Sequence, residues 1–302
     1  MSRNATMFGP DTFLGVDPCT LDDAATYEGA DVVIVNAPSD APAGARPALP
    51  LRIDALRQLR VLDAGDVGSA AAVADAVTRV ATAGAVPFVL GAHGTIALSD
   101  ITGVALRHAT GRIAVIHIEA HAENADIHPG HPHGPGRPTD RLLESGAVRA
   151  DRLVAIGPCG SRPGPGTQPP AQGVRRYAPT EIAGRGLDAC VDEATATAAR
   201  DCDGVFLAVD LHASGPCAAR GTDSRGGLTT RQFLHAVRRL AGELPLVGLD
   251  VVEVSGPHDY PDVTAFLGRR VVLEALSGMA SRRRGDTWRP ARPLLVGRGT
   301  TV

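Results

Sequence analysis

The chain alternates between short, continuously apolar runs and longer segments in which apolar residues recur at helical spacing. The apolar runs, rich in Val, Ile and Leu, predict buried strands over Asp31–Asn36, Pro87–Gly91, Arg112–Ile118, Arg152–Gly157, Val205–Leu211 and Pro245–Val254. The other segments predict helices over Ala71–Ala83, Ile96–Ala109, Leu187–Ala199, Thr229–Leu240 and Pro261–Ala280. Continuously apolar strands separated by helices are typical of a parallel sheet covered on both faces. We therefore expect a three-layer α/β/α fold with a mostly parallel, doubly wound sheet.

Three segments lack this pattern. Ala125–Arg137 and Gly157–Pro170 are rich in Gly and Pro and are expected to be loops. The tail Ser281–Val302 carries three consecutive arginines and then Trp288. We expect it to form a solvated turn followed by a final edge strand or strap.

Ionisable side chains gather where the predicted strands end. They are His93 after one strand, Glu119, His121 and Glu123 after the next, Asp210 and His212 at the end of a third, and Glu253 at the end of a fourth. In doubly wound folds, functional residues lie in the loops beyond the carboxyl ends of the strands. These side chains are therefore expected to meet at one edge of the sheet.

All of these residues except Glu253 form a set of six potential ligands for divalent metals. At a strand end, residues two apart lie on the same face, so both Asp210 and His212 could reach one ion. Carboxylates that bridge two cations, with one imidazole on each, describe a dinuclear hydrolytic site that lowers the pKa of a shared water. The alternative is a set of separate surface residues; a single pair would favour that alternative, whereas all six favour a metal site. His117, two residues before Glu119, is expected to be a core or supporting histidine.

The amino-acid composition of the chain excludes several classes of function. The 302 residues include 30 basic and 33 acidic side chains, which nearly cancel to a net charge of −3, so no nucleic-acid partner is expected. Every basic residue is arginine, which excludes lysine Schiff bases and a P-loop lysine. The five cysteines form no C-x-x-C pair, and no apolar run reaches the roughly 18 residues of a membrane span. We expect a cytoplasmic protein with no membrane partner.

Five motifs occur in a fixed order along the chain. They are Gly91-Ala92-His93-Gly94, Glu119-Ala120-His121-Ala122-Glu123, His133-Gly134, Ala208-Val209-Asp210-Leu211-His212 with Gly226-Gly227-Leu228-Thr229 downstream, and Glu253-Val254-Ser255-Gly256-Pro257. This order resembles the motifs G-G-D-H-S, D-A-H-x-D, H-G, S-x-D-x-D with G-G-L-T, and E-V-x-P of the ureohydrolase superfamily of arginase, agmatinase and guanidinobutyrase. The resemblance implies the arginase-like α/β/α fold. We expect a single domain over residues 1–302, with its core at about 28–280 between an N-terminal arm and a C-terminal tail.

The departures from the superfamily pattern concern the metal ligands. Glu119 and Glu123 stand where the superfamily has aspartates, and His212 replaces another aspartate. Because each replacement can still bind a metal, we interpret these changes as altering the metal preference of the site rather than abolishing metal binding. The resemblance implies manganese, whereas three imidazoles beside three carboxylates favour Fe, Zn, Ni or Co. We expect one or two divalent transition metal ions; His121, Asp210 and His212 alone would suit a single ion, iron in particular.

The resemblance also implies a reaction: metal-dependent hydrolysis of a C–N bond in a guanidino or amidino small molecule, releasing urea or a related fragment. Glu253 would bind the guanidinium, for which a carboxylate is the bidentate partner, and His133 would pass a proton to the leaving amine. Homo-oligomers, trimers or hexamers, are implied as well. Glu253 paired with a local arginine and His133 as an exposed loop residue are the alternatives. Two other functions remain open, a specialised-metabolism enzyme with different chemistry and a metal-poor pseudoenzyme subunit.

Overall fold

The computed structural model describes residues 12–37, 57–91, 96–107, 112–119, 138–158, 172–214, 227–253 and 263–286. Within them, nine strands form one sheet in the order β1-β3-β2-β4-β9-β8-β5-β6-β7, and every pairing is parallel. The strands are β1 (Asp17–Pro18), β2 (Val32–Ala37), β3 (Val61–Asp66), β4 (Val86–Gly91), β5 (Ile113–Ile118), β6 (Leu153–Ile156), β7 (Arg175–Tyr177), β8 (Gly204–Asp210) and β9 (Leu246–Val252). The predicted parallel sheet is confirmed.

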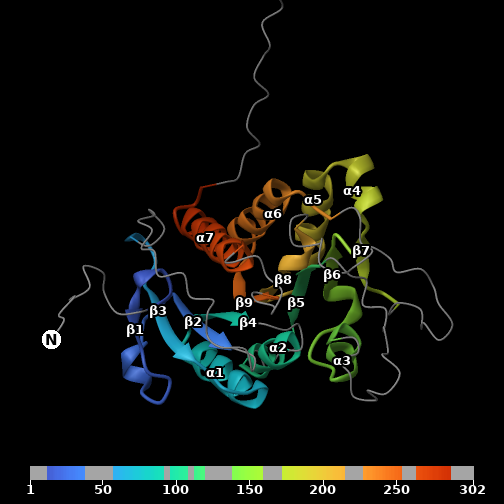
Figure 1. Cartoon of the computed structure of the whole chain (residues 1–302). Coiled ribbons are helices and arrows are strands. Elements are labelled where there is room, and N and C mark those ends of the chain that lie inside the picture. Colours follow the sequence, from blue (N-terminus) through green and yellow to red (C-terminus); the bar gives the residue numbers. More distant parts are fainter. Residues whose placement is uncertain are drawn as a thin grey trace, which may run out of the picture.

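Helices cover both faces of the sheet, which makes three layers (Figure 1). One layer holds α1 (Ala70–Thr82), α2 (Ile96–Arg107) and α3 (Pro138–Glu144); the other holds α4 (Pro179–Arg185), α5 (Leu187–Ala198), α6 (Thr230–Glu243) and α7 (Val263–Arg283). Single turns of 3-10 helix lie at Phe13–Gly15, Ala24–Thr26, Ala150–Arg152 and Leu211–Ala213. The fold is therefore the three-layer α/β/α arrangement that the sequence predicts.

The central strands are apolar throughout because helices bury both of their faces. On β5 and β8, Val115 and Phe206 pack in an apolar cluster with α1 and α2. Their neighbours Ile116 and Leu207 point the other way and pack in a second cluster with α6 and α7. This alternation assigns each strand residue to one helical layer, and it extends to the polar residues near the strand ends.

Three strands, the two short helices α3 and α4, and part of the tail differ from the sequence prediction. β1 and β7 are only two and three residues long, and β3 contains Asp63, Gly65 and Asp66, so none of them shows a long apolar run. The expected turn from Ser281 is wrong for its first residues, because α7 continues to Arg283. The guanidinium of Arg282 donates to the carbonyl of Glu243 at 2.8 Å, and that of Arg283 lies 2.8 Å from the Asp31 carboxylate. These contacts hold the last turn of α7 against its neighbours; residues 287–302 lie outside the described part of the chain.

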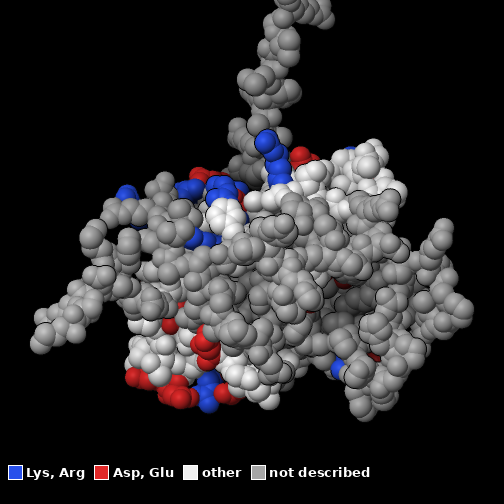
Figure 2. Space-filling view, viewed as in Figure 1, with Lys and Arg blue, Asp and Glu red and all other residues white. Residues whose placement is uncertain are grey.

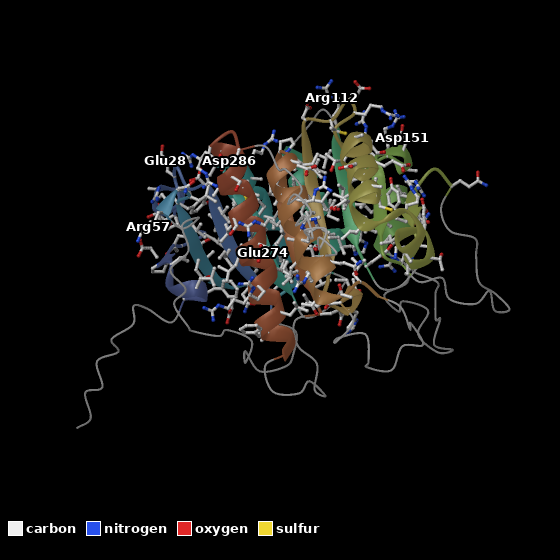
Figure 3. All side chains as sticks on the ribbon, turned by 90° about the horizontal axis from the view of Figure 1, so that it is seen from above. Glu28, Arg57, Arg112, Asp151, Glu274 and Asp286 are labelled. Carbon is white, nitrogen blue, oxygen red and sulfur yellow. The ribbon has the colours of Figure 1, made fainter. Side chains whose placement is uncertain are left out.

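The edge at which the strands begin carries exposed ion pairs. Arg112 directly precedes β5 and Asp151 precedes β6, and both side chains lie along this edge in Figure 3. Arg112 pairs with Asp203, and Arg149 pairs with Asp151 at 2.7 Å. Such exposed pairs contribute little to stability. The candidate site residues lie at the opposite edge, where the strands end.

The face of the molecule drawn in Figure 2 carries charges of both signs, arginines as well as acidic residues. Among the described residues, no helix combines the length and the apolar character that crossing a membrane requires.

Candidate metal centre

Three adjacent strands in the middle of the sheet, β9, β8 and β5, bring the described members of the predicted site to one edge. β4, β9, β8 and β5 are neighbours in that order (Figure 1). Glu119 directly follows β5, Asp210 is the last residue of β8, and Glu253 directly follows β9. Since all four strands are parallel, these residues share the carboxyl edge, as the sequence predicts.

Glu119 is held in place by the neighbouring strand β6 and by a histidine of β5, the strand that it follows. Its backbone N–H donates to the carbonyl of Ile156 at 3.1 Å, and its side chain is only 6% exposed. Nδ1 of His117 lies 3.2 Å from Oε2 of Glu119, because residues two apart on β5 point to the same face. A nearly buried carboxylate with an imidazole at its side is a group whose orientation is fixed before any ligand arrives.

Asp210 and His212 form a second polar pair beside Glu119. Ile118 of β5 is in register with Val209 of β8, so the residues that follow them, Glu119 and Asp210, lie on adjacent strands. Oδ1 of Asp210 accepts a hydrogen bond of 2.8 Å from the backbone N–H of His212 and thereby starts the 3-10 turn Leu211–Ala213. This turn places Nδ1 of His212 3.7 Å from the same oxygen, and the Asp210 side chain is 12% exposed. The turn keeps both side chains at the strand end.

Glu253 has an unusual backbone. Its φ angle is +61°, in the left-handed region that residues other than glycine rarely occupy. Among the described non-glycine residues, only Leu14 and Asp201 share this property. Strained backbone of this kind persists where the surrounding structure enforces it, and it concentrates at functional sites. The left-handed conformation directly follows the end of β9, at the residue predicted to bind substrate.

The structure describes three of the six predicted metal ligands, Glu119, Asp210 and His212, together with the predicted substrate-binding residue Glu253. His93, His121, Glu123 and the proposed proton carrier His133 lie outside the described residues. Within the described part of the chain, no three His, Cys, Asp or Glu side chains form a group that could hold an ion. The full ligand set therefore remains a prediction.

One buried acidic pair was not singled out from the sequence. Asp250 interrupts the apolar run of β9, and Asp100 lies on α2; both side chains are fully buried. The sequence does indicate that Asp250 has a partner, because an aspartate inside an otherwise apolar central strand is rarely tolerated without one. The partner, however, comes from an element far away in the sequence.

A model of the arginase family matches residues 30–278. The chain belongs to the arginase family. The match covers most of the chain, and it confirms both the superfamily resemblance and the expected enzyme class, a hydrolase of this family. The first and last residues matched lie close to the predicted core limits of 28 and 280.

Individual relatives agree with the family match. Formimidoylglutamase of Halalkalibacterium halodurans is 30% identical over 244 residues, which cover 74% of this chain and 73% of the relative. Among the first six curated relatives, the match spans between 61% and 73% of the relative's length.

Solved structures show the same fold at lower identity. The structure of proclavaminate amidinohydrolase from Streptomyces clavuligerus superposes with a TM-score of 0.75 at 23% identity, covering 93% of this chain and all of that one. A formiminoglutamase variant from Trypanosoma cruzi, determined with Mn²⁺, gives a TM-score of 0.71 at 20% identity over 87% of this chain and 97% of that one. The arginase-like fold is thereby confirmed.

Proposed function

We propose that this arginase-family protein hydrolyses a C–N bond of a guanidino or amidino small molecule in a metal-dependent reaction, with release of urea or a related fragment. The observation that carries the proposal is the position of three acidic residues along one sheet edge. Glu119, Asp210 and Glu253 end three adjacent parallel strands. Two of the three, Glu119 and Asp210, are nearly withdrawn from solvent, and a cation bound there would stabilise such buried carboxylates.

The metal would be held by His93, Glu119, His121, Glu123, Asp210 and His212. The described members of this set are ligand types that suit a divalent ion: two carboxylates that are mostly excluded from water end adjacent strands, and the imidazole of His212 lies beside one of them. One or two ions, when bound, would lower the pKa of a water molecule and present it as hydroxide. Family membership favours Mn²⁺, whereas the additional imidazole of His212 favours Fe, Zn, Ni or Co.

The remaining residues of the proposed site act on the substrate. Glu253 would accept hydrogen bonds from a planar guanidinium or amidinium through both carboxylate oxygens. His133 would carry a proton to the leaving amine, a role suited to an imidazole near neutral pH. His117 would keep the carboxylate of Glu119 oriented through the contact at 3.2 Å.

We also propose the location of the protein, its oligomeric state and the type of partner that it binds. We expect a cytoplasmic homo-oligomer, trimer or hexamer, whose partner is a small molecule rather than a nucleic acid or a membrane. Light scattering coupled to size-exclusion chromatography measures the oligomeric state.

The function is tested with protein purified without added metal, followed by elemental analysis and a panel of guanidino and amidino compounds assayed for urea, ammonia and formamide. Glu253→Gln keeps the shape of the side chain and removes its charge. Losing a charge-assisted bidentate pair should lower kcat/KM about 10- to 100-fold, with metal content unchanged.

The matched control is Glu274→Gln on α7, which removes a carboxylate that pairs with Arg238 and Arg270 away from the site. It should retain wild-type kcat/KM. Metal loss in Glu253→Gln would make Glu253 a ligand instead. Turnover confined to neutral substrates would replace the guanidino proposal by another chemistry on the same fold, and protein that binds no metal would indicate a pseudoenzyme.

A further inference from the structure

Two fully buried carboxyl groups meet beneath the candidate metal centre. Asp100 of α2 and Asp250 of β9 are both 0% exposed, and their side chains are hydrogen-bonded to each other. Burial and mutual repulsion raise the pKa of Asp100 well above its usual value, and burial raises that of Asp250 to about 7. Asp100 is the group that keeps its proton, so it donates to Asp250.

Asp250 lies on the same face of the sheet as the proposed ligands, one row of side chains earlier along the strands. In the strand register, His117, Ala208 and Asp250 form one row across β5, β8 and β9. Two residues earlier on β9, a Cβ added to Gly248 would lie 3.2 Å from Val104 of α2, so this face of β9 points to α2. Asp250 therefore points into the layer that holds Asp100, and the end of the next strand, at Asp210, lies directly above its row.

The Asp250 carboxylate has a second contact, which links it to the metal-binding strand. Its Oδ1 accepts a hydrogen bond of 3.0 Å from the backbone N–H of Val209. Val209 immediately precedes Asp210, the residue that starts the 3-10 turn carrying His212. The carboxylate thus ties β9 to β8 at the last position before the proposed ligands.

Packing alone does not explain two buried acids at this place. Ala208, Val115 and Val252 occupy nearby positions on the same face and are apolar. Replacing a buried polar pair by apolar residues of similar shape is often neutral or stabilising. An aspartate at position 250 with a protonated partner at position 100 is therefore better explained by a role in positioning other groups than by packing.

We propose that Asp250, oriented by Asp100, is a positioning residue that fixes the end of β8 so that Asp210 and His212 bind the same metal ion as Glu119. The inference rests on the proposed function, since it concerns the proposed metal site. Asp250 does not touch the metal; it acts through the backbone of Val209.

The test measures affinity for Mn²⁺ and for Zn²⁺ by competition with a chelating dye, on folded protein checked by circular dichroism and thermal unfolding. Asp250→Leu removes the acceptor for the Val209 N–H and should weaken metal binding about 10- to 100-fold, as loss of outer-shell support does. Asp250→Asn keeps an oxygen acceptor and should restore affinity to within about threefold of wild type. Asp100→Asn can still donate to Asp250 and should behave similarly, whereas Asp100→Leu should weaken binding.

The control variant is Thr78→Val on α1, whose hydroxyl bonds the carbonyls of Ala74 and Gly103 in the same helical layer. It loses partly buried hydrogen bonds on a different element from β8 and β9, so its metal affinity should equal that of wild type. If Asp250→Leu does not fold, the positioning role is tested by comparing the metal affinity of Asp100→Leu with that of Asp100→Asn.

Wild-type affinity in Asp250→Leu, or in Asp100→Leu where that variant decides, would overturn the inference while the proposed function stands. Equal weakening in Thr78→Val would also overturn it, because the effect would then follow stability alone. Wild-type protein that binds neither ion would overturn the proposed function, and the inference with it.

Discussion

Nδ1 of His117 lies 3.2 Å from Oε2 of Glu119, so a histidine within β5 supports the carboxylate that follows the strand. The two residues share a face because they are two apart on a strand. The flanking positions on β6 and β8, Ala155 and Ala208, are small, which leaves room for the imidazole between them. The contact gives the first prediction.

Replacing His117 by Phe keeps the bulk of the ring and removes the nitrogen that faces Glu119. We expect metal affinity to fall by about tenfold, in the range typical of residues that orient a ligand. Isothermal titration with Mn²⁺ measures this affinity. His117→Asn retains a donor and should lose less; equal affinity in wild type and His117→Phe would assign His117 to packing alone.

Replacing His212 by Ala should remove most of the bound metal, because the imidazole is the nitrogen ligand of the described set. Elemental analysis of purified variants provides the measurement. His235→Ala is the matched control: its Nε2 lies 2.8 Å from Asp188 in a pair that joins α6 to α5, away from the strand ends. Wild-type metal content in His212→Ala would remove His212 from the ligand set.

Restoring the family's carboxylates should change which metal is preferred. The triple variant Glu119→Asp, Glu123→Asp and His212→Asp replaces an imidazole by a harder oxygen donor. We expect affinity for Mn²⁺ to rise relative to Fe²⁺, Zn²⁺ and Ni²⁺ by about tenfold, since nitrogen ligands favour the later metals. Competition between metals at fixed total concentration tests the order, and an unchanged order would mean that site geometry sets the preference.

Glu253→Gly should stabilise the protein while abolishing guanidino hydrolysis. The left-handed conformation costs a non-glycine residue about 1–2 kcal/mol, partly offset by the greater entropy that glycine loses on folding, roughly 0.5–1 kcal/mol. A gain of up to about 1 kcal/mol in the free energy of unfolding is expected. Urea unfolding and kcat/KM provide the two measurements.

Asp201 supplies the matched control for this trade-off. Its φ angle is +53°, and it lies before β8, at the opposite end of the strand from Asp210. Asp201→Gly should show a comparable gain in stability with unchanged kcat/KM. If Glu253→Gly is less stable than wild type, contacts of the glutamate side chain outweigh the backbone strain.

Local patterns in the sequence predicted most of the elements, but not β1, β3, β7, α3 or α4, and they predicted the edge at which the candidate site residues would lie. Continuous apolar runs such as Val205–Leu211 predict strands buried on both faces because only a sheet covered by helices hides both sides. Parallel strands place their carboxyl ends at one edge, so Glu119, Asp210 and Glu253 could be assigned to that edge before any fold was known. Family motifs added the metal and the substrate class, which periodicity does not encode.

Only the tertiary structure decided which strands are neighbours and which polar groups support the site. β9 lies between β4 and β8, an order that depends on packing of the whole chain rather than on any local pattern. The same is true of Asp100 and Asp250, whose contact joins α2 to β9, and of the left-handed backbone at Glu253. The sequence shows an aspartate in an apolar strand but neither its partner nor the strained backbone, because the energy of a buried acid or a strained residue depends on what surrounds it in space.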